Sequence, residues 1–594
     1  MMDYAASLAQ QFHIRPEQAK NVISLIDEGN TVPFIARYRK EAHGSLDDQT
    51  IRQLSERLEY LRGLDARRAE VYGQIETLGA MTEEISASLE RAQTLSEIED
   101  IYRPYRPKRR TRASVARERG LQPLADAIIA QDRHSAAPLI LAEAYVDAER
   151  ELPTAQDALN GAMDIIAETV SDHPSVRRRL RVVAMAQGKI VSCAAQEQDS
   201  VYAQYYEFSE PAAKIAGHRV LALDRGEREG FLKVALEFDE SKAISIIESE
   251  VVREGSPCTQ AVRNAARDAY ERLIFPSLER EVRGELTDRA VSQAIRVFAM
   301  NLGELLMQPP VKGKTVLALD PGYAHGCKVA VVGPTGSVLD TAVIYPVPPR
   351  SKVAEAKAVL KRLVEKTGAE VIAIGNGTAS RETELFAAEF IRESGLELSY
   401  MVVSEAGASV YSASKLAVGE LPMYDVNLRS AVSIARRMQD PLAELVKIDP
   451  KAIGVGQYQH DMPKRQLDEA LGGVVEDCVN RVGVDLNTAS PALLAHIAGV
   501  NETISKNIVA YREENGGFSS RGELKKVPRL GPKAFEQCAG FLRVSESGNP
   551  LDNTAVHPES YAAARQLLRL CGYTERDIHP DGLTDLPEKV RALG

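Results

Sequence analysis

Residues 316–340 read VLALDPGYAHGCKVAVVGPTGSVLD, and three short apolar runs in this stretch are separated by tight turns. The first run ends in Asp320, and a Pro-Gly turn separates it from the second run, residues 328–332. The third run, residues 338–344, follows a turn rich in glycine and proline. Short apolar runs bounded by such turns are typical of β-strands. The stretch therefore predicts three consecutive strands, with one acid at the end of the first.

A carboxylate at the end of such a strand occurs in nucleases that hold Mg²⁺, so Asp320 is a candidate catalytic residue. Two-metal phosphodiester chemistry requires several carboxylates around metals that lie about 4 Å apart. Glu405 is a candidate second acid, because LELSYMVVSEAGAS predicts a further strand that ends at this residue. Asn376, in the sequence IGNG, supplies no acid at the strand between them.

A third acid is expected from a late helix, and the sequence there reads NLRSAVSIARRMQDPL. Arg429 and Ser430 stand about where the acid should be, and Asp425 and Asp440 lie outside the helix. A cation at that place would repel a divalent metal rather than bind it. We therefore expect Asp320 and Glu405 to be remnants, and we expect no metal ion and no cofactor.

Two hypotheses remain open for this region. In the first, the two acids are inherited with the fold and serve as helix caps, turn acids or salt-bridge partners. In the second, they belong to a metal-dependent nuclease or junction resolvase. A third carboxylate within metal reach of Asp320 and Glu405 would favour the second hypothesis.

Composition limits the possible partners of the chain. Its 594 residues are enough for several domains. The net charge of −11 argues against binding of polyanions by the whole surface, so nucleic acid would have to contact local basic patches. The six cysteines are scattered without any CxxC pair, which is typical of reduced thiols in a cytoplasmic protein. There is neither a signal-peptide pattern nor a run of about 18 apolar residues, so we expect no membrane contact.

The hydrophobic pattern divides the chain into four parts. Residues 1–310 predict an almost entirely helical region, with strand-like interruptions around residues 181–184 and 202–208. Ser45 is a candidate N-cap within this region, and Gly79 is a candidate helix end. An α/β domain is expected at residues 312–445. Tandem helical hairpins are expected at 446–545, and a helical segment at 546–594. The fold class is therefore multi-domain and mostly α, with one α/β domain on an elongated helical scaffold.

Two hairpin units share the same pattern, in which a helix ends, a glycine-bearing turn follows and a second helix begins. The first turn contains Gly499 and Val500, with Asn501 where a second glycine is usual, and the second turn contains Gly531. Glycine lets the backbone approach a phosphate, and the next helix offers free N–H groups to it. The second unit also carries four basic side chains, Lys525, Lys526, Arg529 and Lys533. We expect sequence-independent binding to a phosphate backbone here; the alternative is a packing module that binds nothing.

A second basic stretch, IYRPYRPKRRTRASVARERG, begins at Ile101. Tyrosines 102 and 105 interleave with its bases, which could neutralise phosphates while the rings stack on nucleobases. The alternative is a structural connector, with the arginines paired to acids such as Glu97, Glu99 and Asp100. The candidate binding residues in this stretch are Arg103, Arg106, Lys108, Arg109, Arg110 and Arg112.

Longer motifs resemble the bacterial Tex family of transcription accessory proteins over essentially all of residues 1–560. They occur in the order expected for that family: TVPFIARYRKEAHGSLD, YRPYRPKRRTRASVARERGL, YYEFSEPAAKIAGHRVLALDRGE, LALDPGYAHGCKVAVV, AIGNGTASRETE, SEAGASVYSAS and IGVGQYQHDM. The resemblance implies a helical scaffold with a helix-turn-helix-like part, a YqgF/RNase H-like domain and tandem helix-hairpin-helix motifs. It also implies a C-terminal OB-fold RNA-binding domain, and no barrel-like strand pattern follows the last helical segment here. We therefore expect that domain to be absent and binding to be weaker than in the family.

Together these observations favour a cytoplasmic, monomeric scaffold that binds RNA or DNA. We expect it to act in transcription, near RNA polymerase. We expect contact with the phosphate backbone rather than base readout, and no enzymatic activity.

Overall fold

The computed structural model describes residues 3–107, 110–196, 198–578 and 582–592. They form two compact units. The first unit contains the described residues up to Ser7 together with Glu56–Ala294. The second contains Leu8–Ser55 and the described residues from Ile295 onward. The division into four parts drawn from the sequence stays a prediction.

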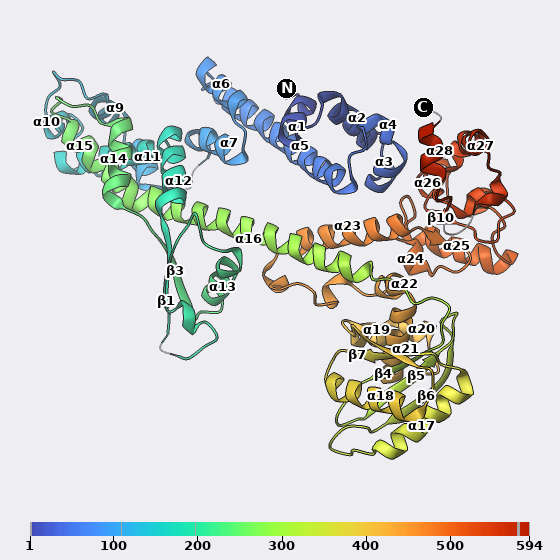
Figure 1. Ribbon diagram of the computed structural model, residues 1–594. Helices are drawn as coiled ribbons and strands as arrows, with labels where there is room; N and C mark the ends of the chain where they lie inside the picture. The colour runs from blue at the N-terminus through green and yellow to red at the C-terminus, as the bar shows by residue number, and fades with distance from the viewer. Residues whose placement is uncertain (1–2, 108–109, 197, 579–581, 593–594) are drawn as a thin grey trace. The chain divides into compact units, whose positions relative to one another are not determined.

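The first unit is mainly helical (Figure 1). Its buried positions recur every three to four residues along α11, at Ala158, Ala162, Ile165 and Ile166, as expected for a helix that packs through one face. The helices that lie wholly in this unit are α6 (Glu83–Arg91), α7 (Leu95–Tyr102), α8 (Arg112–Glu118), α9 (Gln122–Ala130), α10 (Pro138–Glu143), α11 (Ala155–Ser171), α12 (Pro174–Gln187), α13 (Gly217–Arg228), α14 (Glu240–Val251) and α15 (Thr259–Asp268).

The first unit also contains a three-stranded antiparallel sheet. One of its strands begins at Glu207, within the interruption predicted at residues 202–208, whereas residues 181–184 are helical. The strand order is β2 (Glu207–Pro211), β1 (Lys189–Ala194), β3 (Leu232–Glu237). Buried and exposed residues alternate along β3, which is the pattern of a strand with one face on the core.

Three further helices are divided between the two units. Helix α1 spans Tyr4–Phe12, α5 spans Asp48–Thr77 and α16 spans Phe275–Leu306, and a boundary between the two units falls within each of them. Gly79 ends α5 as predicted: it has a φ of +66° and donates to the Glu76 carbonyl at 2.9 Å. Ser45 is not the N-cap of α5, because the carboxylate of Asp47 accepts the N–H of Thr50 at 2.6 Å instead.

The α/β domain of the second unit contains the three strands predicted first. β4 (Val316–Asp320), β5 (Cys327–Val332) and β6 (Val338–Ile344) form an antiparallel meander. β7 (Val371–Gly375) and β8 (Ser399–Val403) extend the sheet parallel to β4, which gives the order β6-β5-β4-β7-β8. This topology is RNase H-like, and with the surrounding helices it confirms the predicted fold class.

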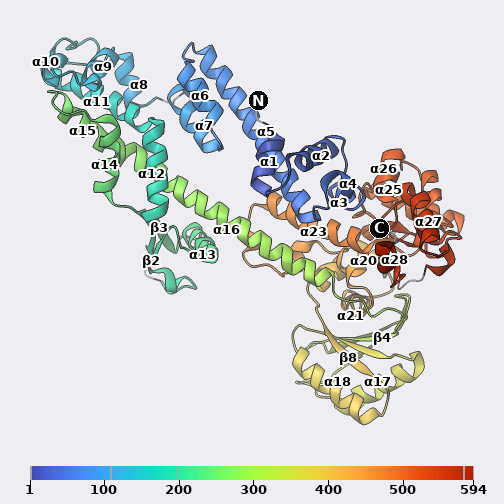
Figure 2. The same ribbon diagram turned by 45° about the horizontal axis from the view of Figure 1, so that its top comes forward.

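Helices cover both faces of this sheet (Figure 2). Helices α17 and α18 pack on the face that contains Leu317 and Leu319, while α21 packs on the face that contains Val316 and Ala318. Full burial of each large aliphatic side chain stabilises the fold by about 1.5–3 kcal/mol. The helices of the domain are α17 (Val353–Thr367), α18 (Ser380–Ser394), α19 (Ala408–Ala413), α20 (Lys415–Glu420), α21 (Val426–Gln439) and α22 (Pro441–Leu445).

The remainder of the second unit contains the helical hairpins. A short parallel pair, β9 (Val484–Asp485) and β10 (Leu542–Arg543), ties the two ends of the hairpin module together. The helices are α2 (Pro16–Asp27), α3 (Val32–Tyr38), α4 (Lys40–His43), α23 (Lys464–Val482), α24 (Pro491–Leu494), α25 (Glu502–Asn515), α26 (Pro532–Cys538), α27 (Tyr561–Leu570) and α28 (Leu586–Ala592).

N-terminal residues pack directly on the hairpin module. Buried Gln537 in α26 accepts the backbone N–H of Thr31 at 2.9 Å and donates to Asn30 at 2.8 Å. The Tyr38 ring lies 5.0 Å from the ring of Phe541. These contacts join residues about 500 positions apart in the chain. Across the described residues, no helix has both the length and the apolar character needed to cross a membrane.

Candidate nucleic-acid interface and a pair of strand-end carboxylates

The structure brings Asp320 and Glu405 together at the carboxyl ends of parallel strands. Asp320 is the last residue of β4, and Glu405 follows β8 by two residues, with β7 between the two strands. Glycines after and at the end of β7 make room for the second carboxylate. A Cβ on Gly377 would lie 1.5 Å from Glu405 Oε1, and a Cβ on Gly375 would lie 2.6 Å from Oε2. Only glycine at these positions accommodates an inward-facing Glu405.

The pKa values of both carboxyl groups are raised above their usual range. Burial raises the pKa of Asp320, and the Ser430 hydroxyl and the charge of Lys328 only partly oppose the rise. Burial, followed by the negative charge of Asp320, raises the pKa of Glu405. A backbone hydrogen bond from Gly377 and the charge of Arg437 oppose that rise. Glu405 Oε2 is buried and accepts no hydrogen bond within the described part of the chain.

The late helix α21 corrects one detail of the sequence analysis. Arg429 does not face the acid pair, because its guanidinium donates to the carbonyls of Leu421 at 3.1 Å and Ser412 at 3.4 Å. Ser430 lies against Asp320 instead. The cation near Glu405 is Arg437, seven residues after Ser430 and therefore on the same face of the helix. That spacing was the signal in the sequence that could have identified Arg437.

Arg437 is held rigidly beside the strand ends. Its guanidinium donates to the carbonyls of Ser404 at 2.9 Å and Ala406 at 2.7 Å, and burial lowers the pKa of Arg437 to about 10. The acids that flank α21 are used as caps: Asp425 accepts the N–H of Leu428 at 2.9 Å, and Asp440 that of Ala443 at 3.0 Å. Asn376 accepts the N–H of Glu405 at 3.0 Å.

The donor set does not fit a two-metal centre. Such a centre requires several converging carboxylates. Here only two carboxyl groups converge, and their neighbours are a hydroxyl, an ammonium and a guanidinium group. A third acid that would complete a metal site is not found within residues 3–107, 110–196, 198–578 and 582–592.

The two hairpin turns share one backbone plan. Gly499 (φ +77°) and Arg529 (φ +64°) both adopt the left-handed conformation. Val500 and Leu530 follow them, and both are buried. Asn501 and Gly531 are then the N-caps of α25 and α26. The sequence analysis compared the glycines of the two turns, and it missed that Arg529 is the structural counterpart of Gly499.

The first turn is largely closed. A Cβ on Gly499 would lie 2.6 Å from Gln537 Cβ, so this turn packs against α26. Val500 is 5% exposed, and its backbone N–H already donates to Ile497 at 2.9 Å. The Asn501 side chain accepts the N–H of Ile504 at 2.9 Å, which occupies a donor at the start of α25. Little of this turn is left for a phosphate.

The second turn is open and basic. Gly531 is exposed, and a Cβ there would meet nothing within 4 Å. Lys525 lies over the Phe535 ring at 4.8 Å, and Lys526 pairs with Glu523 at 3.3 Å. Lys533 donates to Asn30 at 2.6 Å. Arg529 is exposed and pairs with no acid of the described chain. We call Lys525, Lys526, Arg529, Gly531 and Lys533 the second-hairpin cluster.

The basic tyrosine stretch, in the first unit, is partly structural. Tyr102 is 7% exposed and packs in a core with Leu64 and Ile98. It is therefore not a platform for stacking bases. Arg103 lies 3.8 Å from Glu281, and burial, followed by the charge of Arg177, lowers the pKa of Arg103.

The acids proposed as partners of this stretch are used elsewhere. Glu99 pairs with Arg67 at 2.7 Å. Asp100 pairs with Arg181 at 2.8 Å and also with Arg177. Glu97 accepts the N–H of Thr94 at 3.3 Å as part of a capping box at the start of α7. The described arginines of the basic stretch therefore do not pair with these three acids, and Arg103 lies close to Glu281 of α16 instead.

The remaining bases of the stretch are exposed where they are described. Arg106, Arg110 and Arg112 are exposed, whereas Lys108 and Arg109 lie outside the described residues. Arg110 and Arg112 line a cavity of about 520 Å³ together with acids such as Asp157 and Asp164. These acids reduce the attraction of this cavity for a phosphate.

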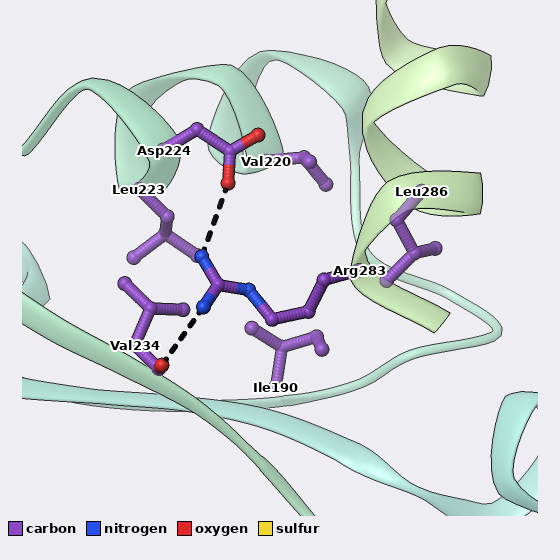
Figure 3. A pocket seen from close by; sticks show the side chains of 7 residues that line it. All are labelled: Ile190, Val220, Leu223, Asp224, Val234, Arg283 and Leu286. Carbon is purple, nitrogen blue, oxygen red and sulfur yellow. Dashed lines mark hydrogen bonds and ion pairs between the residues drawn. The ribbon is translucent and has the colours of Figure 1, made fainter. Parts of the chain in front are cut away.

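A second cavity in the first unit is too small for a ligand. Its volume is about 10 Å³, which is the space of about one water molecule. Figure 3 shows Arg283 within it, donating to the Val234 carbonyl at 3.1 Å and paired with Asp224 at 3.4 Å. This cavity is therefore part of the packing between α16 and the three-stranded sheet.

Family models match most of the chain, in the order expected from the motifs. They describe a Tex-like protein N-terminal domain (residues 2–76), a Tex central region (133–298) and a Tex protein YqgF-like domain (314–439). A helix-hairpin-helix motif (479–543) and a further HHH domain (549–590) follow.

Longer relatives share nearly half of the aligned residues. The chain is 46% identical to the transcriptional accessory protein Tex of Neisseria gonorrhoeae, over 97% of this chain and 76% of that protein. It is 46% identical to protein tex of Bordetella pertussis, over 95% of this chain and 73% of that protein. Protein YhgF of Escherichia coli is 44% identical, over 96% of this chain and 75% of that protein. The chain belongs to the Tex family.

Proposed function

We propose that this chain is a transcription accessory scaffold that binds RNA or DNA through its hairpin module without reading base sequence. The name of the relative from Neisseria gonorrhoeae, transcriptional accessory protein Tex, supports a role in transcription. In this proposal the chain acts as a cytoplasmic monomer near RNA polymerase, and the second-hairpin cluster is its main phosphate contact.

The observation that carries the proposal is the exposed, unpaired charge of Arg529 within the described chain. Its guanidinium is exposed at the tip of the second turn and is not neutralised by an acid of the described chain. Beside it, the backbone at Gly531 is open to close approach. A cation next to an accessible turn backbone favours a phosphate oxygen, and such contacts position a nucleic acid without specifying its sequence.

The first hairpin has a supporting role in this proposal. Gly499 and Val500 shape the module and hold α26 in place, whereas the second turn contacts the phosphate. The exposed arginines of the basic tyrosine stretch, Arg106, Arg110 and Arg112, are secondary contacts. Arg110 and Arg112 share their cavity with acids, which weakens their attraction for a phosphate.

We further propose that the RNase H-like domain does not cleave nucleic acid. Asp320 and Glu405 share a partly buried site with Ser430, Lys328 and Arg437, and two carboxyl groups beside two cations are a poor ligand set for a pair of divalent metals. The acid pair then serves the packing of the strand ends. The competing function is a metal-dependent nuclease, and the convergence of the two acids at the ends of two parallel strands, with β7 between them, favours it.

A cleavage assay separates the two functions. The protein would be incubated with branched DNA and with single-stranded RNA in the presence of Mg²⁺ or Mn²⁺, beside the variant Asp320→Asn. We expect both proteins to bind equally and neither to cleave. Cleavage by the parent protein that is lost in Asp320→Asn would establish the nuclease.

The same variant tests the structural role of the acid pair through pH. The pKa of Asp320 is raised on folding, so the native state holds its proton more tightly than the unfolded chain, and stability falls as pH rises through the raised pKa. Asp320→Asn should therefore have a higher Tm than the parent at pH 7. The difference should close at low pH, below the ordinary carboxyl range of about 4. A lower Tm at pH 7 would contradict this role.

A further inference from the structure

The strand β8 forms one edge of the five-stranded sheet and is left unpaired on its outer side. β8 pairs only with β7 in the described chain, and in that parallel register Ser399, Met401 and Val403 direct their backbone groups toward β7. The N–H and C=O groups of Tyr400 and Val402 therefore point outward. Four backbone hydrogen-bonding groups form an open row along this edge.

The side chains along this edge are apolar and exposed. Tyr400 is 40%, Met401 46% and Val402 41% exposed. Natural sheets usually protect an open edge with charged side chains, proline or a bulge, because an unprotected edge pairs with other strands. β8, which reads SYMVV, has none of these features.

The opposite edge, β6, carries the protection that β8 lacks. The register breaks between Val331 and Val332 of its neighbour β5. Asp340 lies within β6, pairs with Lys366 at 2.8 Å and accepts the backbone N–H of Thr341 at 2.8 Å. The β6 edge thus has a charged residue and a register shift that disfavour strand addition. The β8 edge has neither, so it is open to a partner strand.

We propose that β8 binds an extended peptide segment of a partner protein by strand addition, and that this segment has alternating apolar residues flanked by basic ones. The outward groups of Tyr400 and Val402 supply the main-chain hydrogen bonds, and the exposed side chains of β8 supply the apolar contact. This site does not depend on the nucleic-acid interface.

Charge supports a basic partner segment. Glu397 and Glu384 lie beside β8, and no Lys or Arg occurs in the sequence between Glu393 and Ser414. Glu393 itself is already paired with Lys357 at 2.7 Å, and Glu405 faces inward, so neither adds to this border. The exposed Glu397 lies two residues before the strand, and Glu384 of α18 accepts the Tyr400 hydroxyl at 3.2 Å. Such an acidic border repels phosphates and attracts Lys and Arg, so it favours a peptide over a nucleic acid.

Size supports a short peptide over a second copy of the chain. Only two residues of β8 direct backbone groups outward, so strand addition yields at most four hydrogen bonds. A stable protein–protein interface buries at least about 1,000 Å² in total. A five-residue strand edge is far shorter than such an interface requires, whereas a linear segment needs only the edge and its exposed side chains.

The probe is a fluorescein-labelled peptide, Lys-Lys-Val-Thr-Val-Thr-Val-Lys-Lys, titrated with the full chain and followed by fluorescence anisotropy. We expect saturable binding, and protection of the Tyr400 and Val402 amides in hydrogen exchange. The same peptide N-methylated at alternate valines, or flanked by Glu instead of Lys, should bind at least about tenfold more weakly, which is about 1.4 kcal/mol.

Variants locate the site. Met401→Lys places a charge on the edge, and Val402→Pro removes an outward N–H; each should weaken binding by at least about tenfold. Leu339→Lys on β6 is the matched control, because Leu339 is also 46% exposed, and it should bind as the parent does. The Tm of each variant shows whether it is folded. If Val402→Pro does not fold, Met401→Lys still tests the site.

Several outcomes would overturn the proposal. These are no binding up to about 1 mM peptide, which corresponds to about −4 kcal/mol, equal binding of the N-methylated peptide, or unchanged binding in Met401→Lys. Displacement of the peptide by a single-stranded RNA oligonucleotide would assign the edge to nucleic acid. Concentration-dependent dimerisation that disappears in Met401→Lys would assign it to a second copy.

Discussion

The two hairpins of the module have the same backbone plan and different surroundings. In the first, Gly499 packs on α26 and Asn501 caps the next helix. In the second, Arg529 occupies the same left-handed position, and Gly531 leaves the turn open. The difference indicates that a turn becomes a binding site only when its surroundings leave its backbone and charge accessible. The first turn serves folding, and the second is the proposed contact.

The left-handed backbone conformation of Arg529 costs free energy, which fits the different roles of the two turns. A residue with a Cβ in the left-handed conformation is destabilised by about 1–2 kcal/mol relative to the right-handed one. Gly499 avoids this cost at the equivalent position of the first turn. Strained positions that persist in a fold are often functional, and the Arg529 side chain is exposed without an acid partner in the described chain.

The largest expected effect is on stability, at the first turn. Gly499→Ala would place a Cβ 2.6 Å from Gln537 Cβ in a backbone with φ of +77°. The clash would disturb the hydrogen bonds of Gln537 to Thr31 and Asn30. We expect a loss of about 2–3 kcal/mol in the free energy of unfolding, measured by denaturant titration. A neutral result would mean that the first turn is not held closed by α26.

Removing the cap of the first hairpin should have a smaller effect. Asn501→Ala abolishes the hydrogen bond to the Ile504 N–H, which should lower the free energy of unfolding by about 1 kcal/mol. Nucleic-acid affinity should stay the same, because the first turn remains packed on α26. A gain in affinity would argue that the cap competes with a phosphate and that both turns bind.

The smallest effect has the opposite sign. Arg529→Gly relieves the left-handed strain and should raise the free energy of unfolding by about 0.5–1 kcal/mol, offset in part by the entropy of glycine. The same variant should weaken nucleic-acid binding, so stability and affinity change in opposite directions. Arg529→Lys keeps the charge and the strain, and it serves as the control for both measurements.

The sequence predicted local features well. The strand meander with Asp320 at its first strand end, the acid after β8 and the two glycine-bearing turns follow from short patterns that depend on nearby residues. The direction of side chains was harder to predict. Arg429 and Ser430 are adjacent in sequence, yet they face different parts of the domain, because successive helical residues are about 100° apart.

Long-range contacts explain the other features that the sequence did not predict. The closure of the first turn depends on α26, and α26 is in turn bound by Asn30 and Thr31 from the other end of the chain. No local pattern encodes such pairings. Likewise, Tyr102 was considered for base stacking because it lies among arginines in the sequence, and its burial depends on helices packed around it.

The salt dependence of nucleic-acid binding tests the central claim most directly. Lys525→Ala combined with Arg529→Ala removes two exposed cations of the second-hairpin cluster, and Lys506→Ala removes one from the first hairpin, where Lys506 pairs with Glu502 at 2.7 Å. Dissociation constants for single- and double-stranded RNA and DNA would be measured across a range of salt concentrations. The double variant should bind all of these nucleic acids more weakly, and the slope of log affinity against log salt should shrink by about 1.4–1.8, at about 0.7–0.9 per phosphate contact. Lys506→Ala should bind as the parent does. An unchanged slope in the double variant, or an equal loss in Lys506→Ala, would contradict the assignment of binding to the second hairpin.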